Sequence, residues 1–276
     1  MGKMSDRGFS VEELRKIQKK LKKKGVTAEL YMLSDTLTEN LREGNEAATL
    51  VIRNAADYIL DSPNGSNDLY NEQKGVRYDT MFYAPRKKKM NNKQARYNIV
   101  FGDERKEQYL SNYDGEQATN TIVVDHENDT LFSVEPFDEL PYLSGIRAGL
   151  PKILGDKAKN LNAEGNYYYE ERSGIGYHGD GERKIVIGLS LGKSTTLRYN
   201  WRLPNSSAHP FPDINLVVNN GDMYIMSEKA TGFDWKKRSK VRVVHAAGHK
   251  SYIDKGFKTL EEEKASKKKK SKSKNR

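Results

Sequence analysis

The sequence contains no cysteine in its 276 residues. This absence excludes disulfide bonds, thiolate metal ligands and a cysteine nucleophile, so a metal ion would be held by nitrogen and oxygen ligands. Long apolar runs are also absent, since none approaches the roughly 20 residues that cross a bilayer. The segment around Asp6 and Arg7 lacks the pattern of a secretory signal. We therefore expect a soluble intracellular protein with no membrane partner.

Positive charge is concentrated at one end of the chain. The formal net charge is +10, and eight positive charges fall within residues 264–276, which contain no acidic residue. The preceding residues therefore sum to about +2, and the folded part is close to neutral. We expect residues 259–276 to be a disordered tail, because their composition cannot bury apolar surface. Such lysine-rich segments are typical of solubility or nuclear-targeting signals.

The chain divides into a helical and a β-rich half. Ser10 and Glu13 have the spacing of a capping box, which predicts a helix that ends near Lys24. Further helices are expected over residues 28–42, 45–60 and 142–154, with a turn-rich loop over 62–67. Short β-rich runs separated by turn residues predict strands over 81–83, 97–101, 167–169, 184–191, 196–201, 214–218, 223–226 and 241–244.

This arrangement predicts an α+β fold. Short strands separated by Gly, Pro and Asn are typical of a β-sandwich or jelly roll. The expected organisation is a helical N-terminal region over residues 1–62, a domain built on the β-rich half over 63–258, and the tail over 259–276.

A candidate metal site begins at His178-Gly179-Asp180. Residues two apart in an extended segment face the same side, so an imidazole and a carboxylate can reach one ion. A second histidine would complete a two-histidine, one-carboxylate triad, which is diagnostic of non-heme iron(II) oxygenases. His245 is the candidate because it follows a predicted strand, and His249 is the fallback. The short His-x-Asp match is weak by itself, so the flanking residues matter.

The flanking residues extend this pattern. The set comprises Asn166-x-Tyr168, Gly174, His178-x-Asp180, Gly221-Asp222 at the start of a strand, and the distal His245. Together these residues resemble the AlkB-like Fe(II)/2-oxoglutarate-dependent dioxygenases, and are similar to the AlkB-like proteins of large viruses and algae. The resemblance covers about residues 95–250.

The resemblance implies a double-stranded β-helix (jelly-roll) core with N-terminal helices packed on it. It implies that iron is bound by the triad, and that Asn166 and Tyr168 hydrogen-bond the co-substrate 2-oxoglutarate. Glu182 falls where family members carry an acid that contacts the target base. Arg183 and Tyr83 are further candidates for substrate contact.

The sequence departs from the family pattern after His245. The family carries an arginine there that pairs with the distal carboxylate of 2-oxoglutarate, whereas no arginine occurs here before Arg276. A buried carboxylate still needs a cation, because an unpaired buried charge is very costly. The candidate cations are Lys255, whose spacing resembles the lysine of prolyl hydroxylases, and Lys250, Arg242 and Arg198.

The resulting expectation is an oxidoreductase that uses O₂ to hydroxylate or oxidatively demethylate a nucleic-acid base. Basic runs at residues 15–24, 86–96 and 264–276 are compatible with phosphate contacts, although such runs are often only solvated faces. The first alternative is a 2-oxoglutarate-dependent prolyl or lysyl hydroxylase that acts on protein. The second is a jelly-roll binding module with no enzymatic activity.

Overall fold

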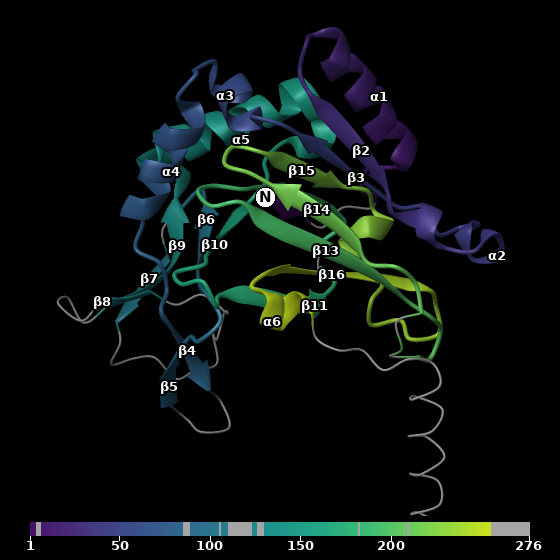
Figure 1. Ribbon diagram of the computed structural model, residues 1–276. Helices are drawn as coiled ribbons and strands as arrows, with labels where there is room; N and C mark the ends of the chain where they lie inside the picture. The colour runs from purple at the N-terminus through teal and green to yellow at the C-terminus, as the bar shows by residue number, and fades with distance from the viewer. Residues whose placement is uncertain are drawn as a thin grey trace, which may run out of the picture.

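The computed structural model describes residues 1–3, 7–84, 89–104, 106–109, 123–125, 130–181, 183–206, 208 and 210–254 (Figure 1). The chain has an α+β fold in which most strand pairs are antiparallel. The described strands form four sheets, and none of these closes into a barrel. No described helix combines the length and the apolar character that crossing a membrane requires.

Two antiparallel sheets lie face to face at the centre of the molecule. The main sheet has five strands in the order β1-β12-β15-β3-β2, and the facing sheet has four in the order β11-β16-β13-β14. The strands of the main sheet are β1 (Gly2–Lys3), β12 (Ile185–Leu189), β15 (Met223–Met226), β3 (Ala48–Ile52) and β2 (Ala28–Met32). Those of the facing sheet are β11 (Gly174–His178), β16 (Arg242–Gly248), β13 (Thr195–Arg202) and β14 (Ile214–Val218).

The two sheets share a core built from alternate residues of their strands. Successive side chains of a strand point to opposite faces, so only every second residue enters this layer. Val51 of the main sheet belongs to one buried apolar cluster with Leu197, Trp201 and Val243 of the facing sheet. The Trp201 indole, a polar group in this layer, donates to the Leu33 carbonyl at 2.9 Å. The layer is therefore a packed interior in which a buried site can be held rigidly.

Helices cover the other face of the main sheet (Figure 1). Leu50 and Ile225 of the sheet pack in a second buried cluster with Leu14 of α1 and Ile146 of α5. The helices of this layer are α1 (Val11–Lys23), α3 (Ala55–Leu60), α4 (Gly65–Gly75) and α5 (Pro141–Leu154), and the short helices elsewhere are α2 (Glu39–Arg42) and α6 (Lys250–Ile253). Single 3₁₀ turns cover Leu33–Thr36, Phe137–Glu139, Asp156–Ala158 and Lys229–Thr231.

A third sheet, here called the side sheet, lies beside the facing pair. Its strand order is β10-β6-β9-β7, with β8 also paired to β9, and β6 and β9 run parallel. Its strands are β10 (Ala163–Tyr167), β6 (Tyr97–Gly102), β9 (Thr130–Pro136), β7 (Lys106–Tyr109) and β8 (Val123–Asp125). The remaining pair is β4 (Met81–Ala84) with β5 (Lys89–Asn92).

Several sequence predictions are confirmed. Helix α1 begins after Ser10 with both capping-box hydrogen bonds present, from the Glu13 amide to Ser10 Oγ at 3.1 Å and from the Ser10 amide to Glu13 Oε2 at 2.7 Å. The expected helix at 142–154 is α5, and the strands expected at 214–218 and 223–226 are β14 and β15. Local signals sufficed for these elements because caps and turn residues mark their ends.

The helices predicted over residues 28–42 and 45–60 are wrong. These segments contain strands β2 and β3, and only the short helices α2 and α3. All five residues of β3 are buried, since helices cover one face and the facing sheet the other. A strand buried on both faces has no alternating pattern, so periodicity alone does not distinguish it from a buried helix. The N-terminal region 1–62 is therefore not only helical but supplies strands to the main sheet.

Two further boundaries are corrected. The loop expected over residues 62–67 contains the start of α4 at Gly65. The strand expected at 167–169 is β10, which covers Ala163–Tyr167 instead, because its pairing with β6 ends at Tyr167. The tail 259–276 lies outside the described residues.

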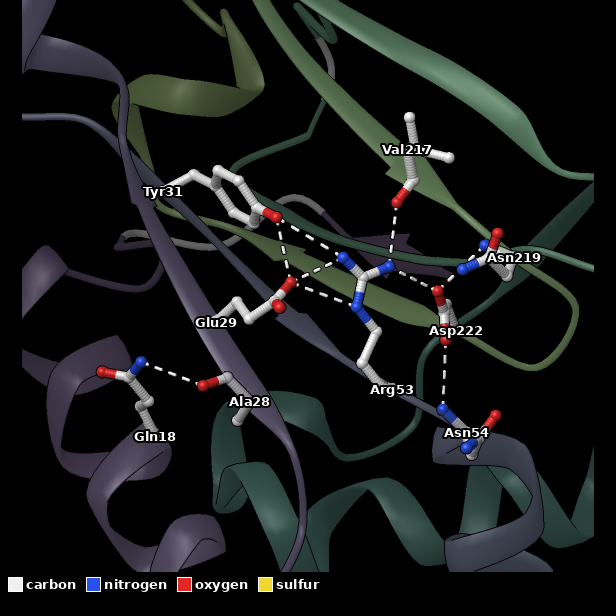
Figure 2. A network of polar contacts seen from close by, with 9 residues as sticks. All are labelled: Gln18, Ala28, Glu29, Tyr31, Arg53, Asn54, Val217, Asn219 and Asp222. Atoms are coloured by element: carbon white, nitrogen blue, oxygen red, sulfur yellow. Dashed lines mark hydrogen bonds and ion pairs between the residues drawn. The ribbon is translucent and has the colours of Figure 1, made fainter.

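A polar network joins strands of both central sheets (Figure 2). Asp222, 1% exposed, accepts hydrogen bonds from Arg53 Nη1 at 2.6 Å and from the backbone amides of Asn54 and Asn219. Arg53 also donates to Glu29 and to the carbonyl of Val217. Asp222 of the Gly221-Asp222 pair thus fixes the turn before β15. Its carboxylate links this turn to the segment after β3 and to the end of β14.

Asp222→Asn is expected to lower the free energy of unfolding by about 2–3 kcal/mol, because Arg53 loses its buried charged acceptor. Chemical denaturation measures this change. Glu29→Gln is the matched control, since the Glu29 side chain is 43% exposed and its ion pair with Arg53 is screened by water, so a loss below about 1 kcal/mol is expected. Equal losses in the two variants would contradict the central role of Asp222.

Candidate metal centre

Strand pairing brings the three predicted ligands together. His178 is the last residue of β11, and the antiparallel register places it opposite His245 of β16. Their ring centroids lie 4.5 Å apart with the planes at 65°. His245 in turn is paired with the buried Tyr199 of β13, on the face that packs toward the main sheet. The two imidazoles therefore meet at the interior surface of the facing sheet.

Asp180 completes the group from the turn that follows β11. Its Oδ2 atom lies 3.4 Å from His245 Nε2. One ligand atom from each of His178, Asp180 and His245 lies within 4.8 Å of the others, so these three residues, here called the metal group, could hold a metal ion. Ligand atoms bound to one metal at about 2.0–2.2 Å are separated by comparable distances.

The turn that carries Asp180 is held by the segment before β16. The Asp180 amide donates to the carbonyl of Thr231 at 2.8 Å. A Cβ atom on Gly179 would lie 2.3 Å from the Gly232 carbonyl oxygen and 2.8 Å from the Trp235 side chain. Only glycine permits this approach, because real Cβ atoms do not tolerate such contacts. Backbone packing thus places the carboxylate.

The protonation state of His178 is suitable for metal binding. Burial and the neighbouring His245 imidazole lower the pKa of His178 to about 4, so His178 is neutral at neutral pH. Its Nδ1 lies 2.8 Å from the carbonyl of Gly176. With the proton on Nδ1 for that hydrogen bond, Nε2 carries the free lone pair that a metal ion requires.

The carboxylate is also in the form that binds cations. Burial disfavours the charged form of Asp180, but the hydrogen bond with His245 and the two imidazoles outweigh it, so the pKa of Asp180 lies below its ordinary value. His245 Nδ1 is buried and has no hydrogen-bond partner in the described part of the chain. Two imidazoles and one carboxylate fit a divalent cation held by nitrogen and oxygen ligands.

The predicted co-substrate residues lie at the end of β10, where Asn166 is exposed. Arg96 donates to the Asn166 side chain. Tyr168 follows β10, is half-buried, and burial raises its pKa to about 12, so its hydroxyl stays protonated. Burial has the largest effect on the pKa of Tyr168 and on that of His178, and the charge of Arg96 lowers both, so Arg96 lies within electrostatic range of both side chains.

The predicted cations Arg198, Arg242 and Lys250 are not brought to the metal ligands. Arg198 alternates with the inward-facing Tyr199 and pairs with Asp254 at 2.5 Å on the outer face of the facing sheet. The Arg242 guanidinium donates to the carbonyls of Leu203, Ser206 and Trp235. Lys250 is exposed on α6. Arg198 and Arg242 face outward because each is an odd number of residues from an inward-facing residue of the same strand, Tyr199 or His245.

The remaining site residues predicted from the sequence lie outside the metal group or outside the described side chains. His249, the fallback ligand, caps α6 by accepting from the Ser251 amide at 3.2 Å and is not part of the metal group. Arg183 forms an ion pair with Glu164 of β10 at 2.8 Å. Lys255 and Glu182 lie outside the described residues, and Tyr83 lies on β4, which is described by its backbone.

Sequence reasoning missed three residues around the metal group. They are Trp235, which packs on Gly179 and Gly181, Tyr224 of β15, and Arg96. The two glycines that flank Asp180 were a usable signal, because glycines beside a ligand indicate close packing. No comparable signal marks Tyr224 or Arg96, since their proximity depends on the pairing of distant strands.

Comparison with known proteins identifies a viral relative. No protein-family model matches the chain. The chain is 32% identical over 256 residues to "Uncharacterized protein R156" of Acanthamoeba polyphaga mimivirus, and the match covers 92% of this chain and 90% of the relative. The chain belongs to the family of this mimivirus protein. The relative's name states no activity.

Proposed function

We propose that the chain is an Fe(II)- and 2-oxoglutarate-dependent dioxygenase of the AlkB-like type. The observation that carries the proposal is the group of His178, Asp180 and His245, whose ligand atoms lie within 4.8 Å of one another. Two imidazoles and one carboxylate match the ligand set of non-heme iron(II) oxygenases, which leaves coordination positions open for a co-substrate and oxygen.

The chain path supports a double-stranded β-helix around this group. Strands β11, β13, β14 and β16 belong to the facing sheet, while β12 and β15 between them belong to the main sheet. The chain therefore crosses repeatedly from one sheet to the other, as a jelly roll requires. The histidines lie on the first and last of these six strands, which pair with each other.

The protein's own residues prepare the site for this chemistry. Bound iron with 2-oxoglutarate and O₂ would supply the oxidation of a C–H bond. His178 keeps its proton on Nδ1 toward the Gly176 carbonyl, which directs the Nε2 lone pair to the ion. Asp180 stays ionised and supplies a negative charge. Asn166 and Tyr168 would orient the co-substrate, and the packed core between the sheets excludes water.

A nucleic-acid base is the substrate class that we propose. Tyrosines gather around Tyr168, with Tyr97 and Tyr169 stacked at 4.1 Å between ring centroids and Tyr167 41% exposed. Exposed aromatic faces stack on unpaired bases, and Arg96 among them provides positive charge for a phosphate. A base within a duplex would have to be flipped out to reach the iron. Oxidation of an N-methyl group would then demethylate the base.

Succinate formation tests the proposed reaction. The anaerobically purified protein, given Fe²⁺ and 2-oxoglutarate and then O₂, is expected to form succinate. A His178→Ala, Asp180→Ala double variant is expected to form none above background. His249→Ala is the matched control and should behave as the wild type, because His249 lies outside the metal group. No difference between the wild type and the double variant would overturn the proposal.

Substrate screening separates the alternatives. Methylated oligonucleotides and prolyl or lysyl peptides would be compared for stimulated succinate release and a change of mass in the substrate. Activity on nucleic acid should fall steeply as salt rises, because binding releases counterions from phosphates. Activity on a peptide with weak salt dependence would establish the protein hydroxylase instead. Absence of both metal binding and succinate would favour the non-enzymatic binding module.

A further inference from the structure

Helix α1 has a strongly basic exposed side. The helix and its C-terminal cap carry seven basic side chains, all of them exposed: Arg15, Lys16, Lys19, Lys20, Lys22, Lys23 and Lys24. No acidic residue occurs between Glu13 and Glu29 to offset them. The opposite side of the helix is apolar, and its Leu14 and Leu21 are buried in one cluster with Leu50 of the main sheet. The apolar side therefore fixes the helix on the sheet, and the basic side faces solvent.

Four of these lysines form a continuous row along the helix, here called the lysine row. Lys16, Lys19, Lys20 and Lys23 follow the spacing i, i+3, i+4, i+7, which places side chains on one face of a helix. Lys16 lies 3.7 Å from the exposed Glu12 carboxylate. The other three form no ion pair within the described part of the chain. Most of the positive charge in the row is therefore available to an external anion.

The stability of the helix does not account for the lysine row. Like charges four residues apart repel, so Lys16 with Lys20, and Lys19 with Lys23, both oppose helix formation. The helix dipole favours cations in the last turn, which includes Lys20 and Lys23. It does not extend to Lys16 and Lys19, which lie earlier in the helix. A row that the fold does not need is a candidate binding surface.

The composition of α1 favours phosphates as the bound groups. Six of its seven exposed basic residues are lysines. A lysine ammonium binds phosphate as a point charge, whereas arginine is preferred where a carboxylate is bound by two parallel hydrogen bonds. A helix that lies on a membrane also buries an apolar face in the bilayer. No large apolar side chain of α1 is exposed, because its apolar side packs on the main sheet.

We propose that the lysine row binds the phosphodiester backbone of a nucleic acid, without regard to its sequence. Helix α1 covers the face of the main sheet that points away from the facing sheet and its His245 (Figure 1). The lysine row is therefore a second surface, separate from the metal group. It goes beyond the proposed reaction, because it holds nucleic acid whether or not the chain oxidises a base.

The salt dependence of DNA binding tests this inference. Affinity of the full chain for a short unmethylated duplex would be measured by fluorescence anisotropy at several salt concentrations, without metal or 2-oxoglutarate. The row variant combines Lys16→Gln, Lys19→Gln, Lys20→Gln and Lys23→Gln. The slope of log K against log salt should become shallower by about 2–4, because each lost phosphate contact contributes about 0.9. Glutamine is a good helix former and removes the repulsion, so the Tm should not fall.

The matched control removes the same charge from scattered exposed lysines. It combines Lys74→Gln, Lys152→Gln, Lys193→Gln and Lys250→Gln. Its slope should change by less than about 1, because these side chains do not form one row. Equal changes in the two variants would show that net charge, and not the lysine row, attracts DNA. Should the row variant not fold, Lys19→Gln with Lys23→Gln decides, with about half the change in slope.

The remaining outcomes are equally distinct. Wild-type protein that does not bind the duplex at low salt, or a folded row variant with the wild-type slope, would overturn the inference. Binding to phosphatidylserine vesicles but not to the duplex, lost in the row variant, would assign α1 to a membrane surface instead. Succinate formation does not enter this test, so failure of the proposed reaction would leave the inference standing.

Discussion

Replacing Asp180 with alanine is expected to weaken Mn²⁺ or Fe²⁺ binding about 100-fold or more. Residues that only orient a metal ligand already change affinity by roughly 10–100-fold, and Asp180 is the one carboxylate in the metal group. Its side chain supplies the negative charge that compensates the ion, whereas His178 and His245 are neutral ligands when bound. Calorimetric titration of the metal measures the change directly.

Thermal unfolding gives a second readout of the same variant. A ligand at about 100 times its Kd stabilises the folded state by about 2.7 kcal/mol, and one at its Kd by only about 0.4 kcal/mol. The wild type should therefore show a clear metal-dependent rise in Tm that Asp180→Ala loses. Asp156→Ala removes an exposed aspartate beyond α5 and should keep the rise. An unchanged rise in Asp180→Ala would mean that the metal binds elsewhere.

Gly179→Ala is expected to disrupt the metal group without any change to a ligand. The new Cβ would meet the Gly232 carbonyl at 2.3 Å and Trp235 at 2.8 Å, so the turn between His178 and Asp180 must shift. A shift of the backbone in this turn costs free energy, because the Asp180 amide donates a hydrogen bond to the Thr231 carbonyl. We expect a roughly 10–100-fold loss of Mn²⁺ affinity and a stability loss of about 1–3 kcal/mol.

Gly181→Ala is the matched control on the other side of Asp180. Its Cβ would lie 3.4 Å from Trp235 Nε1 and 3.8 Å from Cδ1, which are ordinary contacts. Metal affinity should stay within about two-fold of the wild type, since the Trp235 side chain needs to move little to accommodate the new Cβ atom. Comparable losses in Gly179→Ala and Gly181→Ala would show that loop flexibility, and not close packing on Gly232, sets the position of the carboxylate.

The metal group was predicted from local spacing. His178 and Asp180 are two residues apart at the end of a strand, so a shared direction followed from strand geometry. The choice of His245 needed a second strand of the correct length, and the observed register places His245 opposite His178. A histidine four residues later, His249, lies outside the group because β16 ends before it.

The cations could not be predicted in the same way. Arg198 and Arg242 lie on the two strands that carry Tyr199 and His245, yet both face away from the interior. A shift of one residue in a strand reverses the direction of every side chain, so proximity along the sequence says nothing about the face. Arg96, which precedes β6 of the side sheet, acts on His178 across strands, whereas Arg183 acts on Asp180 because it follows Asp180 by three residues.

The sequence by itself determined the features that depend on neighbours along the chain. These include the capped start of α1, the strands β14 and β15 between turn residues, and a set of nitrogen and oxygen donors that could hold a metal ion. Tertiary structure alone decided that β2 and β3 are strands, that Gly179 must touch Gly232, and that Tyr224 points into the interior. Those features arise from contacts between residues far apart in the chain, where burial on both faces of a sheet overrides local periodicity and propensity.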